Sequence, residues 1–136
     1  MKVSVLGCGR WGSFIAWYQA TVLKNEVISW GPEGDYSYEI LKNTGRNEYV
    51  TLDKNITLTC ELRLALESAD VIIISISSQG LRGFMQRITA FNVKDKPFVL
   101  CMKGIEVDTG KRLSEVLTES GISPDKIAVW VGPGHI

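Results

Sequence analysis

The chain has 136 residues, which is enough for one domain with a hydrophobic core and too few for two domains of ordinary size. Hydrophobic residues make up 45% and charged residues 22%, as in globular proteins, and the 15 basic side chains balance the 15 acidic ones. This balance gives no indication of a nucleic-acid partner, and no stretch approaches the about 20 apolar residues of a membrane-spanning helix. The short apolar run at the N-terminus ends at Gly7, too early for a signal-peptide core, so we expect a cytoplasmic protein.

The first 30 residues predict a strand, a helix and a second strand. The run Lys2–Leu6 is mostly branched and apolar without alternation, which indicates a parallel strand buried on both faces. We expect a helix over residues 10–23 and a strand over Glu26–Trp30. The helix is indicated by aromatic and aliphatic residues at helical spacing, namely Trp11, Phe14, Ile15, Tyr18 and Val22.

The next part of the chain is less regular. Glycines and a proline mark a turn over residues 31–35, and a weaker helix is expected over residues 36–43. Residues 44–58 are expected to be mostly irregular, with a short strand at Ile56–Thr59. A short helix over residues 62–68 follows.

The remaining elements continue the alternation of strand and helix. Residues 71–76 form the most apolar run of the chain and are the best candidate for a central strand. A helix at Leu81–Ile88, a strand over residues 98–102, a helix at Leu113–Glu119 and a strand over residues 127–131 follow. The sequence therefore predicts an α/β fold of the Rossmann type, with a doubly wound, mainly parallel sheet and residues 1–136 as a single domain.

Three scattered cysteines, Cys8, Cys60 and Cys101, form no CxxC pair. We therefore expect neither a disulfide framework nor a metal site. Cys60 and Cys101 are interpreted as small buried apolar residues. Cys8 lies between two glycines, where it is either a filler or a reactive thiol, and we favour the filler.

A glycine-rich segment over residues 7–12, here called the glycine loop, connects the first strand to the first helix. Its G-x-G-x-x-G pattern has the strand–loop–helix context of a dinucleotide site. Gly7 permits the tight turn, Gly9 lets a phosphate approach the backbone, and Gly12 allows close packing of the helix. The start of the helix offers free N–H groups to a pyrophosphate. The alternative is a glycine turn without a ligand.

The residues after the second strand bear on the choice of cofactor. An acidic residue is expected there to bind the ribose 2′-hydroxyl, but the strand ends in Trp30-Gly31-Pro32, and Glu33 and Asp35 follow slightly late. No Arg or Lys lies between residues 26 and 40 to pair with a 2′-phosphate, which favours NAD over NADP. Arg10 is either a solvated residue or one that turns toward the adenosine.

Polar residues follow the later strands, where ligands of such sheets bind. Lys103, followed by Gly104, is a candidate to contact a phosphate or another substrate oxygen. The hydroxyls of Ser77 and Ser78 are candidates either to bind the nicotinamide ribose, for which we select Ser78, or to cap a helix. His135 has the chemistry of an acid–base catalyst, but with no partner in sight we interpret it as an ordinary histidine.

Several motifs together make the whole chain resemble the NAD(P)-dependent glycerol-3-phosphate dehydrogenases, specifically their N-terminal NAD-binding domain. The matching segments are Gly7-x-Gly9-x-Trp11-Gly12, Trp30-Gly31, Asn47–Val50, Ala69–Ile73, Lys103–Glu106 and Gly132-Pro133. The chain departs from the family pattern in three places. Pro32 replaces an arginine, Ser77 replaces a proline, and Gly134 replaces a serine or threonine.

The resemblance implies site residues. Arg10 and Trp11 would offer backbone contacts to the cofactor phosphates, and Lys103 would touch both the cofactor and glycerol phosphate. Gly132 and Gly134 would line the substrate site, with Ile136 near the cofactor. The cofactor-binding candidates are thus Gly7, Gly9, Arg10, Trp11, Gly12, Trp30, Ser78, Lys103 and Ile136.

The resemblance also implies a reaction, hydride transfer between the nicotinamide and dihydroxyacetone phosphate or glycerol 3-phosphate. In this family a helical C-terminal domain supplies the catalytic lysine, so we expect no catalytic residue within residues 1–136. The isolated chain is expected to bind NADH with negligible turnover. One alternative is a dehydrogenase of another 3-hydroxy or 2-keto acid, against which the Lys103–Glu106 motif argues. Another is a stand-alone dinucleotide-binding sensor or regulatory module. The oligomeric state stays open, and a homodimer of the full-length protein is one alternative.

Overall fold

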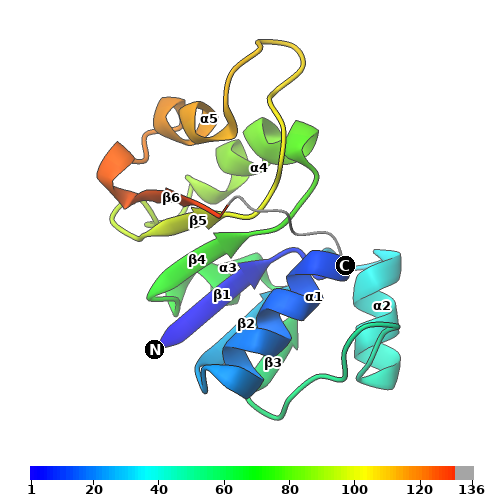
Figure 1. Ribbon diagram of the computed structural model, residues 1–136. Helices are drawn as coiled ribbons and strands as arrows, with labels where there is room; N and C mark the ends of the chain where they lie inside the picture. Colours follow the sequence, from blue (N-terminus) through cyan, green and yellow to red (C-terminus); the bar gives the residue numbers. More distant parts are fainter. Residues whose placement is uncertain (131–136) are drawn as a thin grey trace.

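A computed structural model describes residues 1–130, which form a sheet of six parallel strands with helices on both faces (Figure 1). The order across the sheet is β3-β2-β1-β4-β5-β6, and it reverses between β1 and β4. This is the strand order of dinucleotide-binding Rossmann sheets. The strands are β1 (Lys2–Leu6), β2 (Glu26–Trp30), β3 (Ile56–Thr59), β4 (Val71–Ile74), β5 (Phe98–Leu100) and β6 (Ile127–Val129).

The α-helices are the crossovers between parallel strands, and they divide over the two faces of the sheet (Figure 1). α1 packs on the side of Val3 and Val5, whereas α3, α4 and α5 pack on the side of Leu6. This division confirms the predicted doubly wound α/β fold, with a sheet that is parallel throughout. The helices are α1 (Arg10–Trp17), α2 (Tyr36–Thr44), α3 (Leu62–Glu67), α4 (Leu81–Ile88) and α5 (Leu113–Glu119).

The first predicted helix changes its hydrogen-bond pattern before its end. α1 stops at Trp17 and continues as one π-helical turn, η1 (Tyr18–Val22), in which Leu23 N donates to Tyr18 O at 3.1 Å. Two short 3₁₀ turns complete the elements, η2 (Ser78–Gly80) before α4 and η3 (Pro124–Lys126) before β6.

Three predicted strands are shorter in the structure. One is β6, which ends at Val129 although the strand was expected to reach residue 131. β4 ends at Ile74, although the apolar run continues to Ile76. Its neighbour β1 ends at Leu6, whose carbonyl oxygen still accepts from Ser75 N at 2.8 Å, and the next residue, Gly7, donates to Trp30 O of β2 instead. β5 ends at Leu100, two residues before the end of the predicted strand. Beyond the ends of β4 and β5, Ser75, Ile76, Cys101 and Met102 line the larger of two clefts at the carboxyl edge of the sheet.

Within residues 1–130, no helix is long and apolar enough to cross a membrane. The same residues hold no group of three or more His, Cys, Asp or Glu side chains placed to bind a metal ion. Gly132, Gly134, His135 and Ile136 lie outside the described residues, so their predicted roles stay predictions.

Candidate functional site

Two clefts lie at the carboxyl edge of the sheet, one on each side of the glycine loop. The first cleft, of about 830 Å³, lies between the start of α1 and the segments that follow β4 and β5. The second cleft, of about 630 Å³, lies between the glycine loop, the end of β2 and α4. Both volumes are in the range of small-molecule sites.

The two clefts share Gly9 and the segment 75–77, which follows β4. They therefore meet between the ends of β1 and β4, where the strand order reverses. In open α/β sheets this reversal point is where ligands bind. The arrangement places two clefts next to each other, with Gly9 at the wall of both.

Gly7 and Gly12 are required by the glycine loop itself. Gly7 has a φ of +110°, and a Cβ there would lie 2.1 Å from the carbonyl oxygen of Ser75. A Cβ on Gly12 would lie 1.7 Å from the carbonyl oxygen of Gly7. Gly12 thus permits close packing of the helix on the loop, rather than directly on a strand, while Gly7 forms the predicted tight turn.

Gly9 is different, because a Cβ there would meet no atom within 4 Å. Its φ of −66° is also accessible to any residue. The fold therefore does not need glycine at this position, which borders both clefts. The open space fits a phosphate group that approaches the backbone more closely than a side chain would allow.

The first turn of α1 faces the first cleft. Gly9 is the N-cap, with no side-chain hydrogen bond to the turn, and Trp11 and Gly12 line the cleft. N–H groups in the first turn of a helix have no partner within the helix and form a favourable environment for anions. Arg10 also lines the first cleft, and its guanidinium lies 4.6 Å from the centre of the Tyr49 ring.

The Asn47–Val50 segment supports the start of α1. Asn47 Nδ2 donates to Ser13 Oγ at 2.8 Å, while its Oδ1 accepts from the backbone N–H groups of Tyr49 and Val50 at 2.9 Å each. This segment therefore holds Tyr49 beneath Arg10. The role of Asn47 as the link between this segment and α1 was not predicted, because nothing in the spacing indicates a partner on α1.

The end of β2 forms the wall of the second cleft. Trp30 is buried, donates its indole N–H to the carbonyl oxygen of Cys60 at 2.9 Å, and packs against Phe84. Pro32 and Asp35 line the same cleft. Asp35 is the N-cap of α2, where its carboxylate accepts from the backbone N–H of Ser37 at 2.9 Å, and this cap fixes a negative charge at the cleft.

Arg87 of α4 also lines the second cleft, opposite the end of β2. Its guanidinium lies 5.9 Å from the centre of the Phe84 ring. Arg87 was missed because it lies in the middle of the chain, far in sequence from residues 26–40 where a phosphate-binding cation was sought. Its exposed position at the last turn of a helix gave no other signal.

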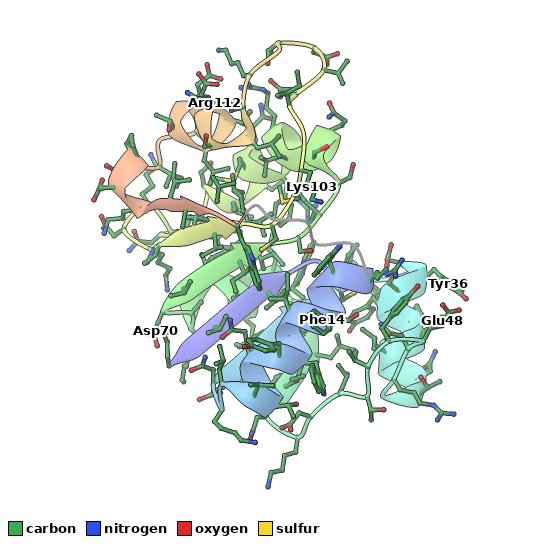
Figure 2. The ribbon with its side chains drawn as sticks, in the orientation of Figure 1. Phe14, Tyr36, Glu48, Asp70, Lys103 and Arg112 are labelled. Atoms are coloured by element: carbon green, nitrogen blue, oxygen red, sulfur yellow. The ribbon has the colours of Figure 1, made fainter. Side chains whose placement is uncertain are left out.

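Lys103 and Ser78 both line the first cleft. Lys103 is exposed at the base of the segment 101–112, here called the Lys103 loop, which links β5 to α5 (Figure 2). Ser78 begins the turn η2, but the N-cap of that turn is Ser77, which makes no side-chain capping bond. The helix-cap interpretation of Ser78 is therefore wrong, and its hydroxyl accepts instead from Gln79 Nε2 at 3.1 Å.

Glu106, the acidic residue of the Lys103–Glu106 motif, is buried rather than directed at the cleft. It accepts two hydrogen bonds from Arg82, at 2.7 and 2.8 Å, and one from the Thr109 hydroxyl. The bonds from Arg82 and then from Thr109 lower the pKa of Glu106 from 4.5 to about 2. Glu106 is therefore an ionised anchor of the Lys103 loop.

The two cysteines near the clefts are weak nucleophiles. Cys8 is 2% exposed, and burial, followed by the charge of Asp35, raises the pKa of its thiol to about 11. Burial also raises the pKa of Cys101, which lines the first cleft, to about 11. Both thiols stay protonated near neutral pH, which supports the interpretation of Cys8 as a filler.

The strand order, the open position at Gly9 and the paired clefts define a dinucleotide-binding Rossmann domain. The sequence model described as "NAD-dependent glycerol-3-phosphate dehydrogenase N-terminus" matches residues 2–136. The chain belongs to this family of oxidoreductases, and it is the N-terminal NAD-binding part of such a protein.

Curated relatives and solved structures agree. Two curated relatives are named glycerol-3-phosphate dehydrogenase [NAD(P)+]. The protein from Prosthecochloris aestuarii is 34% identical over 99% of this chain, and the protein from Bacillus subtilis is 33% identical over 98% of this chain. The chain spans 42% and 40% of these two relatives. A solved glycerol-3-phosphate dehydrogenase from Saccharomyces cerevisiae is 26% identical with a TM-score of 0.78, covering 95% of the chain and 41% of its own length.

Proposed function

We propose that the two clefts hold one NAD molecule, with its pyrophosphate over Gly9 at the start of α1. The observation that carries this proposal is that the clefts meet at the one glycine of the loop whose missing side chain leaves open space. The nicotinamide half then occupies the first cleft beside Ser78 and Lys103. The adenosine half occupies the second cleft beside Trp30.

The preference for NAD over NADP rests on the end of β2. Pro32 stands where the family has an arginine, and the carboxylate of Asp35 lies at the same cleft. A carboxylate accepts a hydrogen bond from a ribose hydroxyl and repels a 2′-phosphate. Arg87 supports the opposite choice, because its guanidinium lines this cleft and suits a phosphate.

For the whole protein, we propose hydride transfer between the nicotinamide and dihydroxyacetone phosphate or glycerol 3-phosphate. The cofactor supplies the hydride chemistry when bound, and the residues of this chain bind and orient it. From the family resemblance we assign Lys103 to the substrate phosphate, Gly132 and Gly134 to the substrate site, and Ile136 to the cofactor site; the last three lie outside the described residues. A helical second domain supplies the catalytic lysine. We propose that residues 1–136 form one domain of a cytoplasmic enzyme that has no nucleic-acid partner. A homodimer is one candidate for the oligomeric state of the full-length protein.

Calorimetry of the folded chain with NADH and with NADPH tests the cofactor assignment. We expect NADH to bind at least about tenfold more tightly, a difference of about 1.4 kcal/mol in binding free energy. The variant Pro32→Arg restores the family's cation and is expected to narrow the difference. Binding of neither cofactor overturns the assignment, and tighter binding of NADPH that is lost in Arg87→Ala overturns the preference for NAD.

A sensor or regulatory module without turnover is the second candidate, and it shares the cofactor site. The two functions differ in turnover by the full-length protein. Oxidation of NADH that depends on dihydroxyacetone phosphate, followed by absorbance, supports the dehydrogenase. Tight NADH binding without such oxidation supports the sensor.

A further inference from the structure

The carboxamide of Gln79 joins the Lys103 loop to the turn that carries Ser78. Gln79 Nε2 donates to the carbonyl oxygen of Ile105 at 2.9 Å, and the backbone N–H of Val107 donates to Gln79 Oε1 at 2.9 Å. One side chain thus pairs with the backbone of the loop on both sides of Glu106. The same Nε2 donates to the hydroxyl of Ser78.

Arg82, near the start of α4, makes a second connection. Its Nε and Nη2 bind the two carboxylate oxygens of Glu106 in a bidentate pair, and Nη2 also reaches Glu119 of α5 at 2.9 Å. Glu106 is 8% exposed, so this pair is shielded from water more than a surface ion pair. The loop is therefore fastened to α4 through the Glu106–Arg82 pair, and to α5 through the ion pair between Lys111 of the loop and Glu119.

The Lys103 loop needs such fastening because little regular structure holds it. Gly104 has a φ of +103°, so the chain turns sharply directly after Lys103. The backbone bonds from Glu106 N to Lys111 O and from Gly110 N to Glu106 O close the tip of the loop onto itself. They shape the tip but do not attach it to the sheet.

We propose that Gln79 and Arg82 are positioning residues that hold Lys103 at the first cleft in register with Ser78. Neither side chain lines that cleft, whereas Ser78 and Lys103 both do. Gln79 bonds to Ser78 and to the loop backbone at Ile105 and Val107, and Arg82 bonds to Glu106, so both hold the loop within four residues of Lys103. The lysine and the hydroxyl that flank the nicotinamide half are thereby set by one rigid unit. This inference rests on the proposed cofactor function, because it assigns to Lys103 a contact with the bound dinucleotide.

A double-mutant cycle tests the proposal, with NADH affinity measured by calorimetry. Gln79→Ala is expected to weaken NADH binding at least about threefold in the wild-type background. In a Lys103→Ala background the same change is expected to alter affinity less than about 1.5-fold, because the residue it positions is gone. A purely structural defect would weaken binding equally in both backgrounds.

Further variants separate positioning from folding. Gln79→Glu keeps an acceptor for the Val107 N–H but cannot donate to Ile105, so we expect an intermediate loss of affinity. Arg82→Lys keeps the charge without the bidentate geometry and is expected to lose less than Arg82→Ala. Gln86→Ala is the matched control, because Gln86 is exposed on α4 and lines neither cleft. Urea unfolding establishes that each variant is folded.

The outcomes are distinct. A loss that disappears in the Lys103→Ala background supports the proposal. Equal losses in both backgrounds, or no loss in either, overturn it while leaving the cofactor function intact. If Gln79→Ala does not fold, Gln79→Glu takes its place in the cycle. A folded wild-type chain that binds no NADH overturns the cofactor function and this inference with it.

Discussion

The glycine loop and the Lys103 loop border the same cleft, yet different forces hold them in place. The glycine loop is shaped by the backbone, since Gly7 and Gly12 leave no room for a Cβ beside neighbouring carbonyl groups. The Lys103 loop is held by side chains, through Gln79 and the Arg82–Glu106 pair. The glycine loop needs positions without side chains, whereas the Lys103 loop needs particular side chains. Adding atoms should therefore damage the first loop, and removing side-chain atoms should damage the second.

The largest effect is expected where the glycine loop is filled. Gly12→Ala places a Cβ against the Gly7 carbonyl and should destabilise the fold by about 3 kcal/mol or more. The cost is large because the clashing atoms belong to the backbone, which cannot move away as a flexible side chain could. The urea midpoint measures this. Gly83→Ala is the control, since Gly83 lies within α4 with open space around it, and should stabilise by about 0.5–1 kcal/mol. Equal midpoints for both variants would contradict the steric account.

A different failure is expected at the open glycine. Gly9→Val should leave the free energy of unfolding within about 1 kcal/mol of wild type, since space and φ both permit a side chain. NADH affinity should fall at least about tenfold, because the added atoms occupy the place of the pyrophosphate. Calorimetry beside urea unfolding separates the two quantities. Unchanged affinity would show that the cofactor does not cross Gly9.

The Lys103 loop should respond to acid pH, whereas the glycine loop, which has no carboxylate among residues 7–12, should not. The pKa of Glu106 is lowered from 4.5 to about 2 in the fold, so its ionised form is favoured more in the folded than in the unfolded chain. That stabilisation is complete above the unfolded pKa and is lost as the pH falls from about 4.5 toward 2. The stability difference between wild type and Glu106→Gln should therefore shrink over this window. A constant difference would remove Glu106 as the titrating group.

The smallest effects are expected in the sheet that supports both loops. The hydroxyls of Ser4 and Ser29 are buried without a hydrogen-bond partner among residues 1–130. Ser29→Ala should change stability by less than about 1 kcal/mol, or raise it slightly, because it removes a desolvated polar group that stabilises nothing. Chemical unfolding measures the change. A large loss would reveal a hydrogen bond at that hydroxyl.

Most of the fold could be predicted from local pattern. The apolar runs of β1, β2 and β3 have the predicted bounds, and so do α4 and α5. The predictions failed where an element's end depends on a neighbour. Ile76 is as apolar as Ile74, but it lies outside the sheet, since β1 ends at Leu6 and Gly7 bonds to β2 instead.

The residues of the candidate site also differ in whether the sequence alone could indicate them. Gly7, Gly9 and Gly12 were recognised because their roles follow from local backbone geometry in a fixed order. Arg87 and Gln79 were not recognised, since their neighbours lie far away in sequence. Arg87 lines the second cleft together with the end of β2, and Gln79 bonds to the Lys103 loop. Glu106 was placed in a motif, but its buried pairing with Arg82 depends on where α4 lies against the loop.

The sequence by itself determined the strand–loop–helix unit and the glycines that a dinucleotide site requires, because both depend on neighbours within a few residues. Only the tertiary structure decided that Gly9 is the open one of the three loop glycines Gly7, Gly9 and Gly12, since the atoms that crowd Gly7 belong to the segment after β4. It also decided how the Lys103 loop is held, because hydrogen bonds across 24 to 28 residues depend on the packed positions of α4 and β5.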